Sequence, residues 1–225
     1  YCLDALTGAE KWSYATGKDT DTYIWLGIQA SPSIDNEIVY LGSRDAKFYA
    51  FNLKTGDTIW TKDEFDRSWM PSTAAIDEKN IYTGSSDSFN FYSINKKTGT
   101  INYATKTNAY TFSSPAIDNE MGYIGSANGR LYGIELASGD IKWEFETIGV
   151  KTDTIKIFDD KGVMDVEGYK ALTKDITDMP ELSSFLDNAF INVGAILSSP
   201  VISNQIIYFG SSDGYVYAIS NKSQD

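Results

Sequence analysis

The chain has 225 residues, of which 42% are hydrophobic; 19 Lys and Arg stand against 31 Asp and Glu, for a net charge of −12 at pH 7. This length allows a sizeable buried core. An acidic balance without any run of Lys or Arg argues against nucleic acid and against direct membrane insertion, and no segment approaches the ~20 apolar residues of a transmembrane helix.

Histidine is absent and cysteine occurs once, as Cys2. These counts exclude a Ser-His-Asp or Cys-His catalytic arrangement and a zinc site built on His or several Cys. Acidic stretches at Asp19-Thr20-Asp21 and Asp159-Asp160 contain only part of a calcium-loop pattern. We therefore expect no metal and no catalytic residues.

In chain order, the sequence repeats one unit of about 40 residues. The first full unit is predicted to have strands at 31–34, 38–42 and 48–51 and a fourth strand that contains Trp60. In every unit the second strand ends in Gly-Ser, at Gly42, Gly84, Gly125 and Gly210. Short β-branched and aromatic runs bounded by Gly, Asn and Asp predict strands. Four antiparallel strands in a repeat of this length predict a propeller blade.

The residues of the unit resemble the pyrroloquinoline-quinone-like (PQQ-like) repeat, whose pattern is roughly Tyr-Ala-(aromatic)-Asp-x-x-Thr-Gly-x-x-x-Trp. Residues 1–12, 49–60 and 132–143 match it well, and residues 92–103 depart at Tyr103. The resemblance implies an all-β propeller with four-stranded blades. It also implies that the repeated Trp12, Trp60 and Trp143 pack between neighbouring sheets.

The first and last units are partial, because the chain starts within a third strand and stops after another. We expect one propeller segment over residues 1–225, incomplete, with about four to five blades in an open arc. Cys2 occupies the position of Ala50 and Gly133, the small residue of the third strand. We expect it to be a packing position and not a lipid attachment site.

The repeat is interrupted once, because Gly125 and Gly210 lie 85 residues apart. The extra residues, 146–190, are predicted to form an insertion with a hairpin (155–158 and 163–166) and a short helix. Asp178 and Glu181 suit a capping box, and Leu182, Phe185, Leu186 and Ala189 fall on one helical face. A degraded fifth blade is the alternative, but the blade motifs are missing here, so we favour a decorated loop.

Aromatic residues precede the predicted first strands, and these strands are innermost in a blade. We expect three of these aromatic residues and one arginine from the same segments to bind a partner where the channel opens: Trp25, Trp69, Tyr110 and Arg67. Tyr, Trp and Arg dominate binding hot spots. The alternative is that they plug the channel. The insertion should lie beside them and form one wall of a concave surface.

The resemblance implies two functional branches. Quinoprotein dehydrogenases have a calcium–quinone site and usually adjacent cysteines, whereas a cofactor-free branch includes the propeller lipoprotein of the outer-membrane barrel-assembly machinery. A single Cys and no recognisable calcium constellation favour the second branch. We expect a non-enzymatic scaffold or binding module for a protein or peptide outside the cytoplasm, without a cofactor. The alternatives are a fragment of a PQQ-dependent dehydrogenase and a carbohydrate-binding propeller.

Overall fold

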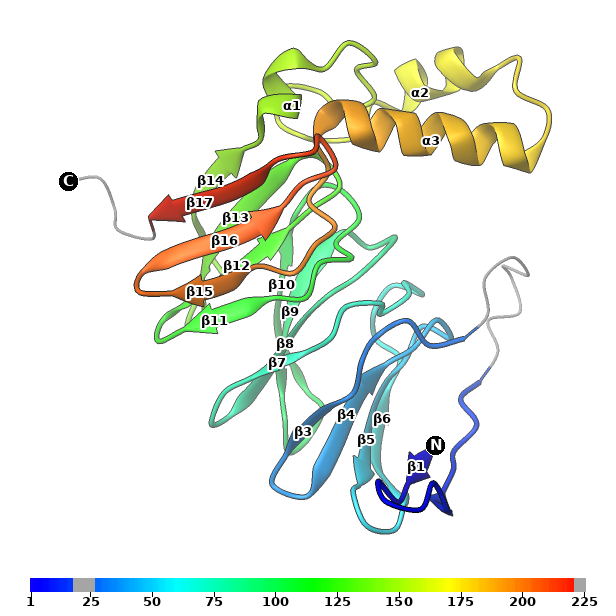
Figure 1. Ribbon diagram of the computed structural model, residues 1–225, viewed down its shortest axis with the longest axis vertical. Helices are drawn as coiled ribbons and strands as arrows, with labels where there is room; N and C mark the ends of the chain where they lie inside the picture. The colour runs from blue at the N-terminus through cyan, green and yellow to red at the C-terminus, as the bar shows by residue number, and fades with distance from the viewer. Residues whose placement is uncertain (18–26, 221–225) are drawn as a thin grey trace.

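The computed structural model describes residues 1–17 and 27–220, which form a row of antiparallel sheets with helices at one end (Figure 1). The first sheet has β1 (Cys2–Leu3) and β2 (Glu10–Trp12). The second has β3 (Ser33–Asp35), β4 (Ile38–Gly42), β5 (Phe48–Asn52) and β6 (Thr58–Lys62). The third has β7 (Ala75–Ile76), β8 (Asn80–Gly84), β9 (Asn90–Asn95) and β10 (Ile101–Lys106).

The fourth sheet has β11 (Ala116–Asp118), β12 (Met121–Gly125), β13 (Arg130–Glu135) and β14 (Ile141–Glu146). The last has β15 (Val201–Ser203), β16 (Ile206–Gly210) and β17 (Val216–Ser220). Strands pair in sequence order within every sheet, each with its chain neighbour. The predicted four-stranded blade is therefore confirmed in three consecutive sheets, and the partial propeller is confirmed with it.

Each strand-one to strand-two hairpin closes through a tight polar turn. Asn36 and Glu37 both have positive φ, at 45° and 64°, and Asn204 and Gln205 repeat this geometry at 51° and 64°. Two consecutive positive φ values are the mark of a type I′ turn, whose twist matches that of the flanking strands. These two turns therefore set the register of the inner strands that they join.

The core lies between neighbouring sheets, and the repeated Trp is part of it. Trp12 Nε1 donates to the Leu53 carbonyl at 2.9 Å, and Trp60 Nε1 donates to the Lys96 carbonyl at 3.1 Å. Each bond joins the fourth strand of one sheet to the sheet that follows. The predicted structural role is thus confirmed for these two residues.

The turn after each second strand also links neighbouring sheets. Tyr217 donates to Asp213 at 2.6 Å, and the same carboxylate accepts the Gly149 N–H that follows β14. In the fourth sheet Asn128 contacts the Tyr132 hydroxyl at 2.9 Å and donates to the Thr107 carbonyl at 3.0 Å. The Asp or Asn of this turn is therefore a structural residue in these two sheets.

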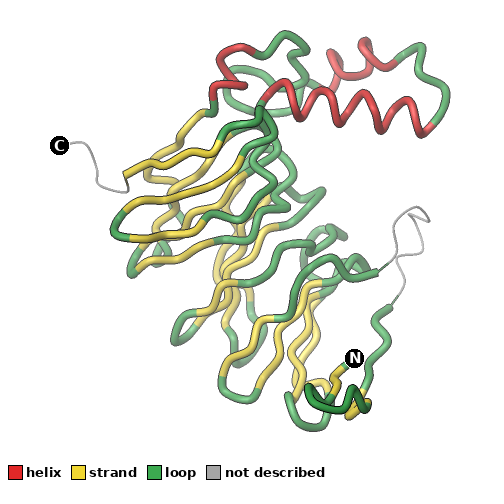
Figure 2. The backbone as a smooth tube through the Cα atoms, in the orientation of Figure 1, coloured by secondary structure: helices red, strands yellow, loops and turns green. Residues whose placement is uncertain are grey.

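The segment between β14 and β15 is helical, and Figure 2 shows that helices are confined to this end of the molecule. It has α1 (Ile148–Thr152), α2 (Val166–Thr173) and α3 (Met179–Val193).

The expected hairpin is reduced to one bridge between Phe158 and Met164, because Asp165 caps α2 and turns the chain into a helix. Asp178 caps α3 by accepting the Glu181 N–H, as its spacing predicted, although α3 is longer than the short helix expected. Within the described ranges no helix is long and apolar enough to span a membrane.

Candidate functional site

The turns between second and third strands and the connections between blades meet at one end of the sheets, here called the loop face. It comprises residues 43–47, 63–74, 85–89, 107–115, 126–129, 147–200 and 211–215. The helices lie on this face, above β13, β14 and β17 (Figure 1). The loop face is the candidate site because binding residues commonly lie on loops that a rigid scaffold holds in position, and here the repeated sheets are that scaffold.

The four residues predicted to bind a partner have different surroundings. Trp25 lies outside the described residues, and Arg67 is exposed, with a positive φ of 58°. Trp69 is half-buried, with the Arg44 guanidinium 4.7 Å from its ring centroid. Tyr110 is also half-buried and packs against the insertion.

Tyr110 is the centre of an aromatic cluster on the loop face. Its ring centroid lies 5.1 Å from Phe89, 5.6 Å from Phe112 and 6.3 Å from Phe190. All four rings are half-buried, so each keeps an edge toward solvent. Burial, with a smaller contribution from Asp87, raises the pKa of Tyr110, which keeps its hydroxyl neutral. The cluster offers apolar contact and one hydroxyl, which suits binding better than proton transfer.

Phe89 and Phe190 were not predicted as site residues. Phe89 belongs to a turn one residue longer than its counterpart, since Gly84 pairs with Phe91 whereas Gly42 pairs with Phe48. Phe89 has φ of 53°, which is uncommon for a bulky side chain and marks a strained turn. Counting residues in this turn would have pointed to it from the sequence alone.

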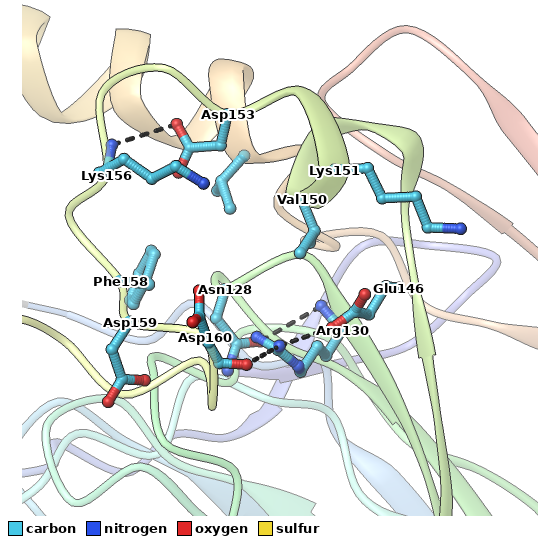
Figure 3. A pocket seen from close by; sticks show the side chains of 11 residues that line it. Asn128, Arg130, Glu146, Val150, Lys151, Asp153, Lys156, Phe158, Asp159 and Asp160 are labelled. Carbon is cyan, nitrogen blue, oxygen red and sulfur yellow. Dashed lines mark hydrogen bonds and ion pairs between the residues drawn. The ribbon is translucent and has the colours of Figure 1, made fainter.

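The second feature of the loop face is a cavity of about 260 Å³ between the insertion and the fourth sheet (Figure 3). Arg130 lies at its base with a side chain that is 4% exposed. Its Nη2 donates to Glu146 Oε1 at 2.6 Å and to the Asp160 carbonyl at 2.8 Å, and its Nε lies 3.3 Å from Glu144 Oε2. Charge-assisted bonds of this kind are strong when solvent is excluded. Arg130 therefore fastens the 159–162 turn to the blade.

Asn128 also holds the 159–162 turn against the blade. Its Nδ2 donates to the Gly162 carbonyl at 3.0 Å. At the other end of the insertion, Thr147 Oγ1 donates to the Val193 carbonyl at 3.1 Å, and Asn192 Oδ1 accepts the Thr154 N–H at 2.8 Å. Hydrogen bonds therefore join the insertion to β13 and its preceding turn, and join the start of the insertion to the end of α3.

The insertion also shares an apolar core with the propeller. Ile157 and Phe158 of the insertion pack with Ala109 and Ala127 of the blades, and Tyr110 lies at the edge of this cluster. The insertion therefore lies beside Tyr110, as expected. The described residues contain no group of three or more His, Cys, Asp or Glu side chains placed to hold a metal ion.

The family to which these blades belong follows from a match over most of the sequence. A family model described as outer membrane protein assembly factor BamB matches residues 1–84 and 56–223. The chain belongs to this family of PQQ-like repeat propellers. The expected family and fold class are confirmed.

Two curated relatives are similar in sequence. A tetrathionate hydrolase of Acidithiobacillus ferrooxidans is 25% identical over 167 residues, which are 64% of this chain and 33% of that protein. The BamB of Francisella tularensis is 28% identical over 142 residues, or 58% of this chain and 30% of that protein. The chain therefore spans about a third of the curated relatives it matches.

Solved structures share the fold at low identity. BamB from Moraxella catarrhalis superimposes with a TM-score of 0.59 and 16% identity, covering 87% of this chain and 47% of that one. A quinohemoprotein alcohol dehydrogenase from Pseudomonas putida HK5 gives a TM-score of 0.61 and 20% identity, covering 89% of this chain and 30% of that one. Since a BamB and a dehydrogenase superimpose about equally well on this chain, the fold alone does not distinguish their functions.

Proposed function

We propose that this chain is a non-enzymatic propeller scaffold that binds a protein partner outside the cytoplasm through its loop face. The observation that carries the proposal is the attachment of the helical insertion, whose turn at 159–162 is held by the buried side chains of Arg130 and Asn128. Buried charged side chains that hold a loop in place are expensive to maintain. A segment held in one position, like this insertion, suits recognition, since preorganised loops lose less entropy on binding.

The surface beside this wall has the composition of a protein-binding site. The cluster around Tyr110 has four aromatic rings that are neither buried nor fully exposed. Aromatic side chains contribute a large contact area at a low entropic cost and are enriched at interfaces. Phe190 belongs to α3 of the insertion and packs against Tyr110, so the insertion and the aromatic cluster form one surface.

Family membership supports the same proposal. The family model carries the name of an outer membrane protein assembly factor, as do the relatives from Francisella tularensis and Moraxella catarrhalis. A role outside the cytoplasm and a protein as partner are consistent with that name. We propose both for this chain.

The enzymatic alternatives come from the other relatives, a tetrathionate hydrolase and a quinohemoprotein dehydrogenase. The donor set does not fit a calcium–quinone site, because the described residues include no group of three or more His, Cys, Asp or Glu side chains placed to hold a metal ion, and the chain has one cysteine. We propose that the chain binds no quinone. Titration of pyrroloquinoline quinone with calcium, followed by absorbance, should give no stoichiometric complex, and incubation with tetrathionate should give no turnover.

The test of the proposed function is site-specific photocrosslinking in the envelope of the host. A photoreactive amino acid replaces Phe112 on the loop face, or Ser138 at the opposite end of the blades as the matched control. Phe112 should crosslink to a discrete protein, and Ser138 should not. Equal crosslinking at both positions, or recovery of the protein in the cytoplasmic fraction alone, would refute the proposal. Because aromatic rings also suit sugars, a panel of soluble glycans is the comparison arm, and saturable binding there would favour the carbohydrate alternative.

A further inference from the structure

The third sheet (β7–β10) departs from the repeat at four positions, where the side chain has an amide or a hydroxyl that its counterparts lack: Asn80, Ser93, Asn102 and Tyr103. The counterparts, in the same order, are Ile38, Ala50, Ile59 and Trp60 in the second sheet and Met121, Gly133, Lys142 and Trp143 in the fourth. The pairing register is the same in all three sheets, including the bulge beside the fourth-strand aromatic residue. The repeat fold therefore does not require these polar side chains.

These four side chains line one cavity of about 340 Å³ at the boundary with the fourth sheet, together with residues 136–138. Asn102 Nδ2 donates to Asn80 Oδ1 at 3.0 Å and to Ser93 Oγ at 3.1 Å. Ser93 is 1% exposed, whereas Asn102 is exposed, so the cavity has a buried polar base and opens to solvent. Positions on three different strands therefore form one connected polar site.

The cavity reflects the smaller size of Tyr103 compared with the tryptophan at the neighbouring boundary. There, Ile38 and Trp60 both pack against the apolar cluster between the second and third sheets. Tyr103 still bonds to the next sheet, because its hydroxyl donates to the Leu136 carbonyl at 3.0 Å, but it fills less space. Empty space and half-buried amides at a sheet boundary cost stability. Since stability alone would favour the apolar residues of the other sheets, the four polar residues indicate a binding site.

The polar groups of the cavity fit an uncharged ligand with several hydroxyls. Asn102 uses both Nδ2 hydrogens, and its Oδ1 accepts no hydrogen bond from the described residues. Asn80 Nδ2 donates one hydrogen, to the Tyr82 hydroxyl at 3.3 Å, and has a second one to offer. An acceptor beside a donor matches a pair of hydroxyls, each of which can donate and accept. An adjoining hollow of about 380 Å³ shares Asn80 and disfavours an anion, because three carboxylates line it: Asp77, Glu120 and Glu135.

We propose that this cavity binds an uncharged sugar, whose ring packs against Tyr103 and whose neighbouring hydroxyls bond to the amides of Asn80 and Asn102. Tyrosine suits this contact because it joins an apolar ring to a polar tip. A volume of about 340 Å³ lies at the lower end of the range for small-ligand sites. Asn80 begins β8, whose other end leads into the loop face. The proposal is therefore independent of the proposed function, and a protein and a sugar can bind at the same time.

The first experiment measures binding of D-glucose, D-galactose and D-mannose to the 225-residue protein by saturation-transfer NMR. At least one of these hexoses should bind saturably at millimolar concentration. The uronate of that hexose, which differs by one carboxylate, should bind at least about tenfold more weakly because of the acidic residues in the adjoining hollow. Absence of saturable binding by all three hexoses, or equal binding of a hexose and its uronate, would overturn the proposal.

The second experiment restores the residues of the second sheet through Tyr103→Trp and Asn80→Ile. Each variant should weaken hexose binding at least about tenfold, since the first fills the cavity and the second removes an amide. Both should keep or raise the urea midpoint, because they fill space with apolar atoms. The matched control is Ile59→Asn, which introduces an asparagine beside Trp60 at the position equivalent to Asn102 and should leave hexose binding unchanged.

Two results of this second experiment would overturn the proposal. Hexose binding that persists in both variants would place the sugar elsewhere, such as at the aromatic residues of the loop face. A lower urea midpoint for both variants would show that Asn80 and Tyr103 serve stability. Crosslinking from Phe112 is expected to be the same in both variants, so failure of this proposal is distinguishable from failure of the proposed function.

Discussion

The blades and the helical insertion are held together by different means. In the blades, an aromatic side chain of the fourth strand donates to a backbone carbonyl of the next sheet at three successive boundaries, so one sequence motif determines several interfaces. The insertion, in contrast, is held to the blades by contacts that do not repeat: the hydrogen bonds from Arg130 and Asn128 and one apolar cluster. Repetition gives a scaffold that tolerates local change, whereas a segment with unique contacts depends on each of them. Recognition of the protein partner is therefore expected in the insertion and stability in the blades.

The strongest test of this division removes the insertion. Replacing residues 151–186 with a short Gly-Ser linker should leave the blades folded and reduce partner binding by at least about a hundredfold, since the wall and its aromatic contacts are lost together. Circular dichroism reports the fold, and envelope crosslinking or calorimetry reports binding. Undiminished binding by a folded shortened protein would show that the insertion is not the recognition element.

A glycine substitution tests the repeated contacts of the blades. Gly99 has φ of 71°, and a Cβ there would lie 2.8 Å from Trp60 Cε3. Gly99→Ala should lower the free energy of unfolding by about 2–4 kcal/mol, from backbone strain and from the displaced ring.

Gly8 provides the matched control for this substitution. It occupies the same turn position in the first sheet, with the same φ of 71°, but a Cβ would meet nothing within 4 Å. Gly8→Ala should cost about 1 kcal/mol, which is the backbone contribution alone. Equal losses in urea denaturation would mean that the glycine is needed only for its φ and not for the contact between sheets.

The attachment of the insertion can be loosened without removing it. Arg130→Met deletes the bonds to Glu146 and to the Asp160 carbonyl. We expect a loss of about 2 kcal/mol, because the bonds are charge-assisted and the remaining groups are left partly buried. Hydrogen exchange should accelerate at residues 158–164 and remain unchanged in β8 and β9.

An exposed ion pair is the control for this variant. Lys170 and Glu167 pair at 2.9 Å on the surface of α2, with side chains 65% and 85% exposed. Lys170→Met should change stability by no more than about 0.5 kcal/mol. If Arg130→Met accelerated exchange throughout the blades, Arg130 would be a core residue and not a fastening for the insertion.

The same contrast explains which parts of the structure the sequence predicted. The turn after the second strand occurs four times, three times as Gly-Ser-x-Asp and once, at 125–128, as Gly-Ser-Ala-Asn, and this repetition made the strands and their order predictable. In the insertion, the cap at Asp178 depends on local sequence and was predicted, whereas α2 (Val166–Thr173) was not predicted, since its first residue was assigned to the strand 163–166. The Tyr110 cluster depends on Phe190, which lies 80 residues away and reaches it only through the fold.

The smallest expected effect is a pH dependence at one contact between neighbouring sheets. The Asp35 carboxylate accepts a hydrogen bond from Lys96 Nζ at 2.6 Å, and this bond lowers the pKa of Asp35 below its usual 3.8. A lowered pKa in the folded state stabilises the protein above the unfolded pKa, and the stabilisation is lost as pH falls through the folded value. Since the Asp35 side chain is 30% exposed, we expect Asp35→Asn to cost about 1 kcal/mol at pH 7 and progressively less as pH falls below 3.8. Glu37→Gln, which removes an exposed partner of Lys54, should show no such dependence. If urea denaturation gave the same loss for Asp35→Asn at pH 7 and throughout the acid range below pH 3.8, the residue would contribute through packing and not through its charge.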